Sequence, residues 1–390
     1  MDTTEQARLL DDVEAFCVEV RPSEELAYVE HRFNGQAIPL ARKHDLLGMP
    51  IATVYGGRGA DAATYARALA RIGREGTGLR TLFSGHISIG QLPIAYWGTD
   101  EQKRRLLPAT ARGERICAFA LTEPDAGSNP LELQTTYERR GDRFVLNGVK
   151  YLISNGGIAD LFIAFAYPKN GPRRMSAMVV EAAGGGIVRE DLTAKMGMPT
   201  ANTAMFEMQD CAVPVENLLG QEGNGFRIAM HTLVAGRLSV AAGCLGVIED
   251  CLTEAAEYAK QRCQHGKPIA KHQLVQQHIA RIEVDRAATE ALVLKAAAAK
   301  SASDADPASA ALQSAADLAC AQAKFFASNA AWDAADRAVQ VFGGRGYSEL
   351  YRPARHLQDV RVCRIYEGTD EILQLKIAAA VLGKEFEAFR

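Results

Sequence analysis

The sequence predicts an α+β protein in which a helical segment, a β segment and a second helical segment follow one another. Residues 1–115 carry apolar residues at helical spacing, as in ARLLDDVEAFCVEV, with Gly-rich breaks at 56–59 and 76–78. Residues 116–220 alternate polar residues with Thr, Tyr, Val and Phe, and residues 221–390 return to helical spacing in an Ala-rich composition. We therefore expect an N-terminal all-α domain, a middle antiparallel β-barrel or sandwich, and a C-terminal domain of packed helices.

The middle segment is expected to contain five to seven short strands. Two dipeptides typical of turns, Gly141-Asp142 and Asn147-Gly148, separate its first β-type runs. LFIAFAYP, RMSAMVVEA and AMFEMQDCAVP continue the pattern as further strands.

The last segment is expected to contain long, tightly packed helices. One runs from Gly225 to about Gln261, and another ends near Lys300. SASDADPASA interrupts the pattern, with Asp306 as the expected N-cap of the next helix and Pro307 at its first position.

Composition excludes several classes of protein. The 390 residues are 48% hydrophobic and 23% charged with a net charge of −3, which argues against nucleic-acid binding and against an anionic membrane surface. No apolar run reaches the roughly 18 residues of a membrane span, and the acidic N-terminus does not resemble a targeting peptide. Eight scattered cysteines without a CxxC pair favour reduced thiols and a cytoplasmic protein.

Two stretches could bind anions or an oxygen-rich ring edge. FALTEPDAGSNP, residues 119–130, leads from a strand into a loop with the hydroxyls of Thr122 and Ser128. On local chemistry alone, a strand exit is the simpler interpretation. RCQHGKPIAKHQ, residues 262–273, places Arg262 near a helix end, where it could bind phosphate or simply complement the helix dipole.

Two further stretches lie near the C-terminus. In QVFGGRGYSELYRP, Gly343 and Gly344 allow close backbone approach, but the spacing is not that of a dinucleotide fingerprint. In IYEGTDEIL, Thr369 is the expected N-cap of a helix, and Glu367 lies just before that helix. The local sequence alone favours the interpretation that Glu367 is a solvent-exposed carboxylate in a turn. The apolar face of this helix is expected at Ile372, Leu375, Ala379 and Leu382.

The sequence gives little support for a metal site or for a catalytic nucleophile. His265, His272 and His278 do not have metal-ligand spacing, so no metal site is predicted. The sequence contains no GxSxG nucleophile motif.

In this order and spacing, the stretches resemble the acyl-CoA dehydrogenase flavoprotein family along nearly the whole chain. The matching motifs are ALTEPDAGS at 120–128, KYLISNG at 150–156, RxxxGKPI at 262–269, GGRGY at 343–347 and IYEGT at 365–369. The helical–β–helical order also agrees with the family, and the resemblance implies that the C-terminal domain is a four-helix bundle.

The resemblance implies FAD and an acyl thioester that is oxidised at its Cα–Cβ bond to a trans-2-enoyl product. Glu367 matches the catalytic base, which removes the α-proton while the β-hydrogen leaves as hydride to flavin N5. Burial of such a carboxylate would raise its basicity. The thioester carbonyl is polarised in the family by the backbone N–H of the base and a flavin hydroxyl.

The family resemblance also implies which residues bind the substrate and the cofactor. The substrate positions are Ser128, Arg237, Tyr366 and Gly368. The cofactor positions, some of them serving the FAD of a neighbouring subunit, are Phe119, Leu121, Thr122, Ser128, Leu152, Ser154, Arg262, His265, Gln273, Gln340, Gly343, Gly344, Thr369 and Glu371.

Gly236 removes a competing assignment for the base. Some members place the base on the long helix just before the arginine that matches Arg237, and Gly236 cannot serve there. Four departures from the family pattern leave room for an unusual acyl group: Leu152, His265, Val234 and Asn129.

The implied partners are an acyl-CoA or an acyl-carrier-protein thioester and an electron-transfer flavoprotein, with the chain forming a homotetramer or homodimer. One alternative on the same fold is a flavin-dependent monooxygenase, against which the retained Glu367 argues. A non-catalytic thioester-binding scaffold is a third reading, disfavoured by Glu367, Arg237 and the FAD-type stretches.

Overall fold

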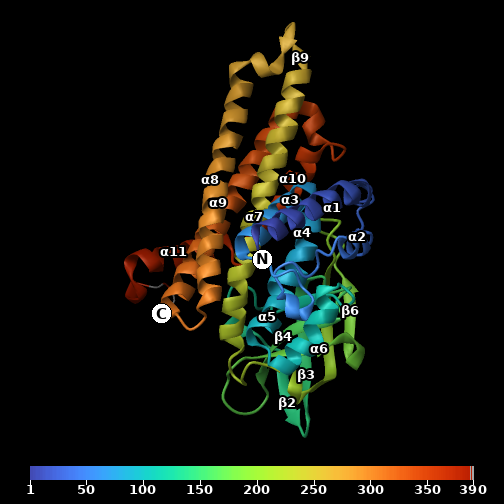
Figure 1. Cartoon of the computed structure of the whole chain (residues 1–390), viewed down its shortest axis with the longest axis vertical. Coiled ribbons are helices and arrows are strands. Elements are labelled where there is room, and N and C mark those ends of the chain that lie inside the picture. The colour runs from blue at the N-terminus through green and yellow to red at the C-terminus, as the bar shows by residue number, and fades with distance from the viewer. Residues whose placement is uncertain (387, 389–390) are drawn as a thin grey trace.

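The computed structural model describes residues 1–386 and 388, and it confirms the order of a helical, a β and a second helical part. Figure 1 shows the sheet at one end of an elongated molecule, the N-terminal helices beside its middle, and a long helical arm that ends at β9. The N-terminal helices are α1 (Thr3–Val29), α2 (Ala37–Lys43), α3 (Ala62–Glu75), α4 (Thr77–Phe83), α5 (Leu92–Trp97) and α6 (Asp100–Ala111).

The middle part contains eight strands rather than five to seven. They are β1 (Cys117–Ala120), β2 (Thr136–Arg140), β3 (Arg143–Ser154), β4 (Leu161–Pro168), β5 (Ser176–Glu181), β6 (Ile187–Asp191), β7 (Thr203–Pro214) and β8 (Leu218–Leu219). Their order is β6-β7-β3-β2-β4-β5-β8, with β1 added beside β4. Most neighbours are antiparallel, but β4 pairs in parallel with both β1 and β2.

The turn prediction holds at one of its two positions. Gly141-Asp142 joins β2 to β3, as expected. The prediction at Asn147-Gly148 was wrong, because β3 continues through it and the register with β7 shifts there as a bulge. A Cβ on Gly148 would lie 2.7 Å from the Thr135 Cα, so this glycine serves a close approach between strands.

The C-terminal part is built on three long helices. These are α7 (Gly225–Gln261), α8 (Gln273–Ala305) and α9 (Ala310–Phe342), and α7 has the predicted bounds. A small hairpin of β9 (Cys263–Gln264) and β10 (Lys267–Pro268) joins α7 to α8, and α10 (Arg352–Val360) and α11 (Asp370–Leu382) complete this part.

The prediction that Asp306 caps α9 was wrong. The N–H of Asp306 still donates to the Ala302 carbonyl at 3.3 Å, so this residue ends α8. Ser309 takes the capping position instead, where its hydroxyl accepts from the Leu312 N–H.

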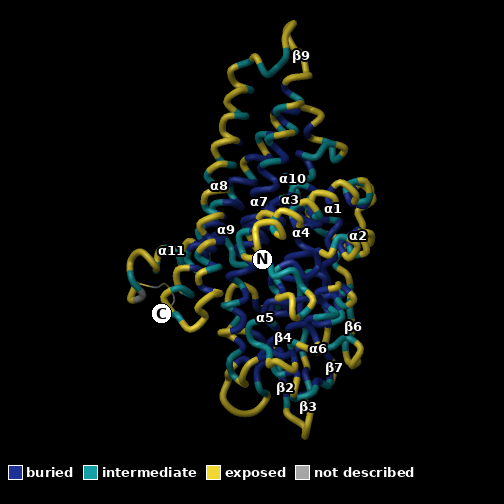
Figure 2. Tube along the Cα trace, in the orientation of Figure 1, coloured by how far each residue is buried: buried dark blue, intermediate teal, exposed yellow. Residues whose placement is uncertain are grey.

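Helix α7 lies at the centre of the molecule and is mostly buried (Figure 2). Glycines allow α3 to approach it closely, because a Cβ on Gly73 would lie 2.5 Å from the Gly243 carbonyl oxygen. By length and composition α7 could cross a membrane, but 89% of its most apolar window is buried inside the protein, which is the pattern of a core helix.

Helix α11 begins as expected but packs differently. Thr369 is its N-cap and accepts from the Ile372 N–H at 3.3 Å. Leu373 is fully buried, whereas Leu375 and Leu382 of the predicted apolar face are 39% and 61% exposed. Ile372 and Ala379 of the same face are partly buried, so the single chain covers this apolar face only in part.

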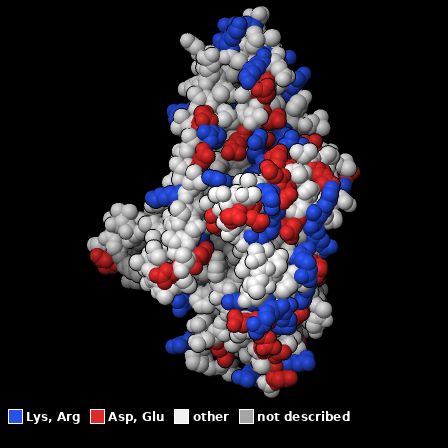
Figure 3. All heavy atoms as spheres, viewed as in Figure 1, with Lys and Arg blue, Asp and Glu red and all other residues white. Residues whose placement is uncertain are grey.

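Charges are spread over the surface, with a basic group at the end of the helical arm (Figure 3). Exposed Arg262, Lys267 and Lys271 lie in this region around β9 and β10. A cluster of cations in this position would suit a phosphate-bearing ligand.

Candidate active site

Glu367 lies in the turn between the 3₁₀ segment Arg361–Arg364 and α11. Its φ is 56° and that of Gly368 is 96°, so two consecutive residues occupy the left-handed region. The Oε2 atom of Glu367 is buried and has no hydrogen-bond partner among the described residues. A carboxylate held in this way is not the solvated turn residue that local sequence favoured.

Two buried cations hold the backbone of this turn. Arg237 on α7 donates from Nε to the Glu367 carbonyl at 3.1 Å, and Lys324 on α9 donates to the Gly368 carbonyl at 2.7 Å. Arg237 is itself paired with Asp317 at 2.7 Å. The two helices therefore fix both peptide carbonyls and thereby the direction of the Glu367 side chain.

The Glu367 carboxyl group rests against α7 at Gly236. A Cβ on Gly236 would lie 2.6 Å from the Glu367 Cδ and 2.7 Å from Oε1. Because real Cβ atoms do not approach so closely, any side chain at position 236 would displace the carboxyl group. The missing side chain of Gly236 is thus part of the geometry of Glu367.

Burial raises the pKa of Glu367 to about 7. Three nearby cations, Arg237, Arg80 and Lys324, act in the opposite direction. Within the described part of the chain, the Glu367 N–H also has no hydrogen-bond partner. The turn therefore offers a carboxyl group that ionises near neutral pH next to an unused backbone donor.

Tyr366 connects this turn to α4. Its hydroxyl accepts a hydrogen bond from Nη2 of Arg80, and the Arg80 guanidinium lies over the Tyr366 ring, 5.6 Å from its centroid. The thiol of Cys363 is 3.2 Å from the same hydroxyl. Tyr366, a predicted substrate residue, thus connects the turn of the candidate base to a buried arginine.

The predicted residues of the β part lie together at the ends of β1 and β3. Phe119 and Leu121 are almost buried, whereas Ser128 is exposed on the loop that follows β1. The Tyr151 N–H donates to the Thr122 carbonyl at 2.9 Å, which brings this loop to the end of β3, where Leu152 and Ser154 lie.

The remaining predicted cofactor residues fall into two groups. Thr369 and Glu371 begin α11, next to Glu367. Around the hairpin and the end of α9, Arg262, His265, Gln273, Gln340, Gly343 and Gly344 are all exposed. In Figure 1 the hairpin and the β part lie at opposite ends of the molecule, so one chain does not bring these sets together.

Family models match nearly the whole chain. The models described as acyl-CoA dehydrogenase N-terminal, middle and C-terminal domains cover residues 3–114, 118–211 and 223–382. The chain belongs to the acyl-CoA dehydrogenase family. Acyl-CoA dehydrogenases are FAD-dependent oxidoreductases that act on CH–CH bonds, and the chain is an enzyme of this class.

Similar proteins support the assignment over the full length. An acyl-CoA dehydrogenase of Bacillus subtilis is 39% identical over 384 residues, which cover 98% of this chain and 99% of the relative. The structure of butyryl-CoA dehydrogenase from Megasphaera elsdenii has a TM-score of 0.92 at 34% identity and covers 98% of this chain and 100% of its own. An acyl-CoA dehydrogenase from Bacillus anthracis, solved in complex with FAD, has a TM-score of 0.92 at 32% identity and covers 100% of this chain and 69% of its own.

The residues at the ends of β1 and β3 fit a flavin. Leu152 has a φ of 57°, which is strained for a residue with a side chain, and it is 54% exposed. An apolar side chain held outward in this conformation can pack against a flat ring. The partly exposed Thr122 beside it can hydrogen-bond to the ring edge.

Two buried cations near Glu367 were not predicted from the sequence. Lys324 could have been found, since it is the cation inside the Ala-rich run ACAQAKFFASN. Arg80 gave no local signal, because GLRTLF resembles an ordinary helix whose arginine faces solvent.

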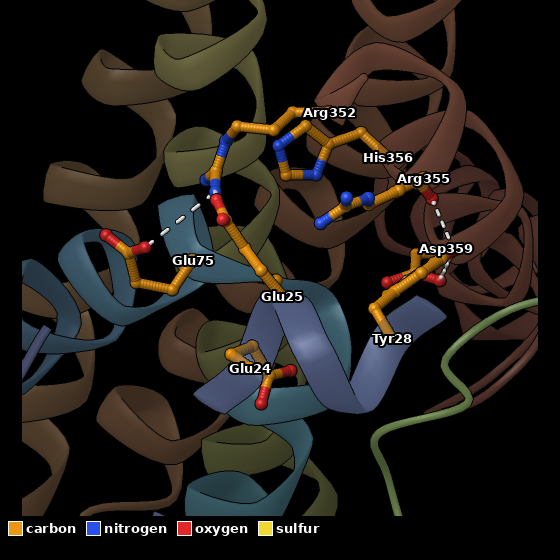
Figure 4. Close-up of a pocket in the computed structure, with 9 residues that line it drawn as sticks. Glu24, Glu25, Tyr28, Glu75, Arg352, Arg355, His356 and Asp359 are labelled. Carbon is orange, nitrogen blue, oxygen red and sulfur yellow. Dashed lines mark hydrogen bonds and ion pairs between the residues drawn. The ribbon is translucent and has the colours of Figure 1, made fainter. Parts of the chain in front are cut away.

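A second group of buried charges lies away from Glu367, where α1, α3, α7 and α10 meet. We call it the Arg352 cluster; it consists of Arg352, Asp250, His356 and Glu75. Arg352 Nε is 2.8 Å from Asp250, which also accepts from His356 at 2.8 Å. Figure 4 shows Arg352 reaching toward Glu75 across a small cleft, with Glu24 and Asp359 among its lining residues.

Proposed function

We propose that the protein oxidises an acyl thioester to its trans-2-enoyl product and that Glu367 is the base that removes the α-proton. The observation that carries this proposal is the buried Glu367 Oε2, which has no partner within the described residues although three cations lie near it. An α-C–H is only weakly acidic, so its removal needs a base of raised pKa and stabilisation of the charge that develops on the carbonyl.

The chain supplies positioning as well as the base. The Glu367 N–H is the proposed donor to the thioester carbonyl, because no described group of the chain uses it. Arg237 and Lys324 hold the two carbonyls of the turn and keep this donor and the carboxylate in a fixed relation. Tyr366 and Gly368 complete the wall against which the acyl group would lie.

The isoalloxazine of FAD would lie against Leu152, with Thr122, Ser128 and Ser154 at its edge. When bound there, FAD accepts the β-hydrogen as a hydride. The exposed residues of the arm, among them Arg262, Gln273 and Gln340, would hold the diphosphate and adenosine of the FAD in a neighbouring subunit. This division of one site between two chains supports a homodimer or a homotetramer.

The proposal also includes the carrier of the acyl group and the acceptor of the electrons. Either CoA or a carrier protein could present the thioester, with Ser128 on the loop after β1 beside it. An electron-transfer flavoprotein is the proposed acceptor. All eight cysteines are free thiols, which favours a cytoplasmic enzyme.

The first experiment adds an acyl-CoA panel to the FAD-loaded enzyme without oxygen and follows the flavin absorbance. The wild-type flavin should bleach, whereas Glu367→Gln should bind the thioester but bleach at least about 1,000-fold more slowly, because the amide cannot accept the proton. Carrier-protein thioesters of the same acyl groups distinguish the two carriers.

Asp359→Asn is the matched control. Asp359 is also a buried carboxyl group with a pKa raised to about 7, but it lies in the other cleft. Its amide variant should bleach at the wild-type rate. Bleaching of Glu367→Gln at the wild-type rate would refute the assignment of the base.

A further inference from the structure

Two buried cysteines meet beside the turn that carries Glu367. Cys244 lies on α7 and Cys363 lies in the 3₁₀ segment Arg361–Arg364, and each is only 1% exposed. Their thiols are close enough to share a hydrogen bond, although they come from distant parts of the chain. The pair therefore joins the central helix to the segment that directly precedes the turn.

The Cys363 thiol lies near two cations. Its sulfur is 3.2 Å from the Tyr366 hydroxyl, which accepts a hydrogen bond from Arg80. The hydrogen bond from the Cys244 thiol lowers the pKa of Cys363 against the opposing effect of burial. The charges of Arg80 and Lys324 lower this pKa further. A larger share of this thiol is therefore ionised at neutral pH than of an ordinary cysteine, and the thiolate is the form that reacts with oxidants.

Every other buried cysteine has a raised pKa. For Cys244 the first cause is the hydrogen bond to Cys363, and burial acts in the same direction. Burial alone is the main cause for Cys17, Cys117, Cys211, Cys251 and Cys320. The pair thus combines one thiol that ionises readily with one that keeps its proton, which is the combination that disulfide formation through a nucleophilic and a resolving cysteine requires.

We propose that Cys363 is an oxidation site, at which a hydroperoxide converts the thiolate to a sulfenic acid that then forms a disulfide with Cys244. In the first step the sulfur attacks the O–O bond of hydrogen peroxide, gains one oxygen and releases hydroxide. In the second step the Cys244 sulfur displaces the sulfenic oxygen, and the proton that Cys244 gives up leaves with this oxygen as water. The peroxide is the two-electron oxidant, and the two thiols become one disulfide.

Burial limits which oxidants can reach the pair. Tyr366 is part of the wall proposed for the acyl site, and its hydroxyl contacts the Cys363 sulfur. A molecule as small as hydrogen peroxide that enters this site is therefore separated from the thiol by one side chain. The oxidant must be small, which is why hydrogen peroxide is the reagent for the test.

The disulfide would act on the proposed base through the chain that follows Cys363. A disulfide holds its two sulfurs about 2 Å apart, closer than thiols that share a hydrogen bond, so the 3₁₀ segment is drawn toward α7. Tyr366 loses its contact with the thiol, and Glu367, which follows it, cannot move freely because its carboxyl group rests against Gly236. A displacement of about 1 Å in a reacting group can cost about 100-fold in rate, so the oxidised enzyme should be nearly inactive. This consequence rests on the proposed function, whereas the oxidation itself does not.

The first test treats the FAD-loaded enzyme with hydrogen peroxide, removes the excess and maps its unreduced peptides by mass spectrometry. The expected product is a cross-link between the peptides of Cys244 and Cys363 that disappears when dithiothreitol is added. Cys263 is the internal comparison, because it is exposed and would react first if exposure alone decided. Oxidation confined to Cys263, or the absence of the cross-link, would overturn the inference.

Substitutions separate the roles of the two thiols. Cys244→Ala should stop the reaction at the sulfenic acid of Cys363, which dimedone traps, and Cys363→Ala should leave Cys244 unmodified. Arg80→Met should slow the oxidation of Cys363, because it removes a charge that lowers the pKa of this thiol. Cys251→Ala is the matched control, since Cys251 is a buried cysteine of the same helix with a raised pKa, and it should form the cross-link at the wild-type rate. Modification of Cys244 in Cys363→Ala would overturn the inference.

Flavin bleaching tests the effect on the site. With an acyl-CoA, the cross-linked enzyme should bleach about 100-fold more slowly than the untreated enzyme and should recover in dithiothreitol. Treated Cys363→Ala should keep its own untreated rate. An unchanged rate in the cross-linked wild type, or an equal loss in Cys363→Ala, would overturn the link between this oxidation and Glu367. If the untreated enzyme bleaches with no thioester, the proposed function fails, while the peptide map still decides whether Cys363 is the oxidation site.

Discussion

Two buried arginines of this protein have opposite surroundings. Arg352 is held by Asp250 and lies near Glu75, and it joins α10 to the N-terminal helices (Figure 4). Arg80 is at least as deeply buried but has a tyrosine hydroxyl and thiols for neighbours. The Arg352 guanidinium has carboxylate partners within the protein, whereas no described carboxylate forms an ion pair with Arg80. The comparison separates a buried charge that the fold balances from one that it leaves without a carboxylate.

The largest effect on stability is expected at the paired arginine. Arg352→Met leaves the buried Asp250 with His356 as its remaining partner and should lower the free energy of unfolding by about 3–5 kcal/mol. Urea unfolding measures the loss. Arg112→Met is the control, since its pair with Glu114 is exposed to solvent and should contribute little to stability. Equal effects of the two substitutions would remove the distinction between structural and surface charges.

A smaller effect of the opposite sign is expected at Glu367. Its folded pKa of about 7 lies above the ordinary 4.5, so the folded state holds the proton longer than the unfolded state. Stability therefore falls as the pH rises from about 4.5 to about 7. Glu367→Gln should flatten this part of the profile and be more stable than the wild type at pH 8, on the order of 2 kcal/mol. A parallel profile for the two proteins would contradict the burial assigned to the carboxyl group.

The smallest effect is expected at the unpaired arginine. Arg80→Met removes a buried charge that has no carboxylate partner, so the free energy of unfolding should change by less than about 1 kcal/mol or should rise. Thermal and urea unfolding without thioester provide the measurement. A loss as large as that of Arg352→Met would show that the protein itself supplies a counter-ion for Arg80.

The sequence was informative where the signals are local. The helical and β parts, the bounds of α7 and the Thr369 cap follow from periodicity and from capping chemistry within a few residues. The errors arose where a distant segment decides the outcome. Gly148 continues a strand because Thr135 packs against it, and Ser309 rather than Asp306 caps α9 because α8 extends to Ala305.

The residues of the candidate site show the same contrast between local sequence signals and contacts with distant segments. Glu367 was found because its motif resembles a known family, although its local pattern suggested a solvated turn. Arg80 was missed because its neighbour Tyr366 is 286 positions away in the chain, and no pattern in α4 reveals that pairing. The motif located the proposed base, whereas the buried arginine beside Tyr366 could be found only from the folded structure.

The contact between Gly236 and Glu367 limits how such an enzyme can change over evolutionary time. A base carried by α7 and a base carried by the turn would claim the same volume, because even a methyl group at position 236 meets the Glu367 carboxyl group. A lineage that moved its base from one element to the other could not pass through a chain that holds both in place. One route leads through an inactive ancestor with neither carboxylate, and the other through a duplicated gene that was free of selection while both positions changed.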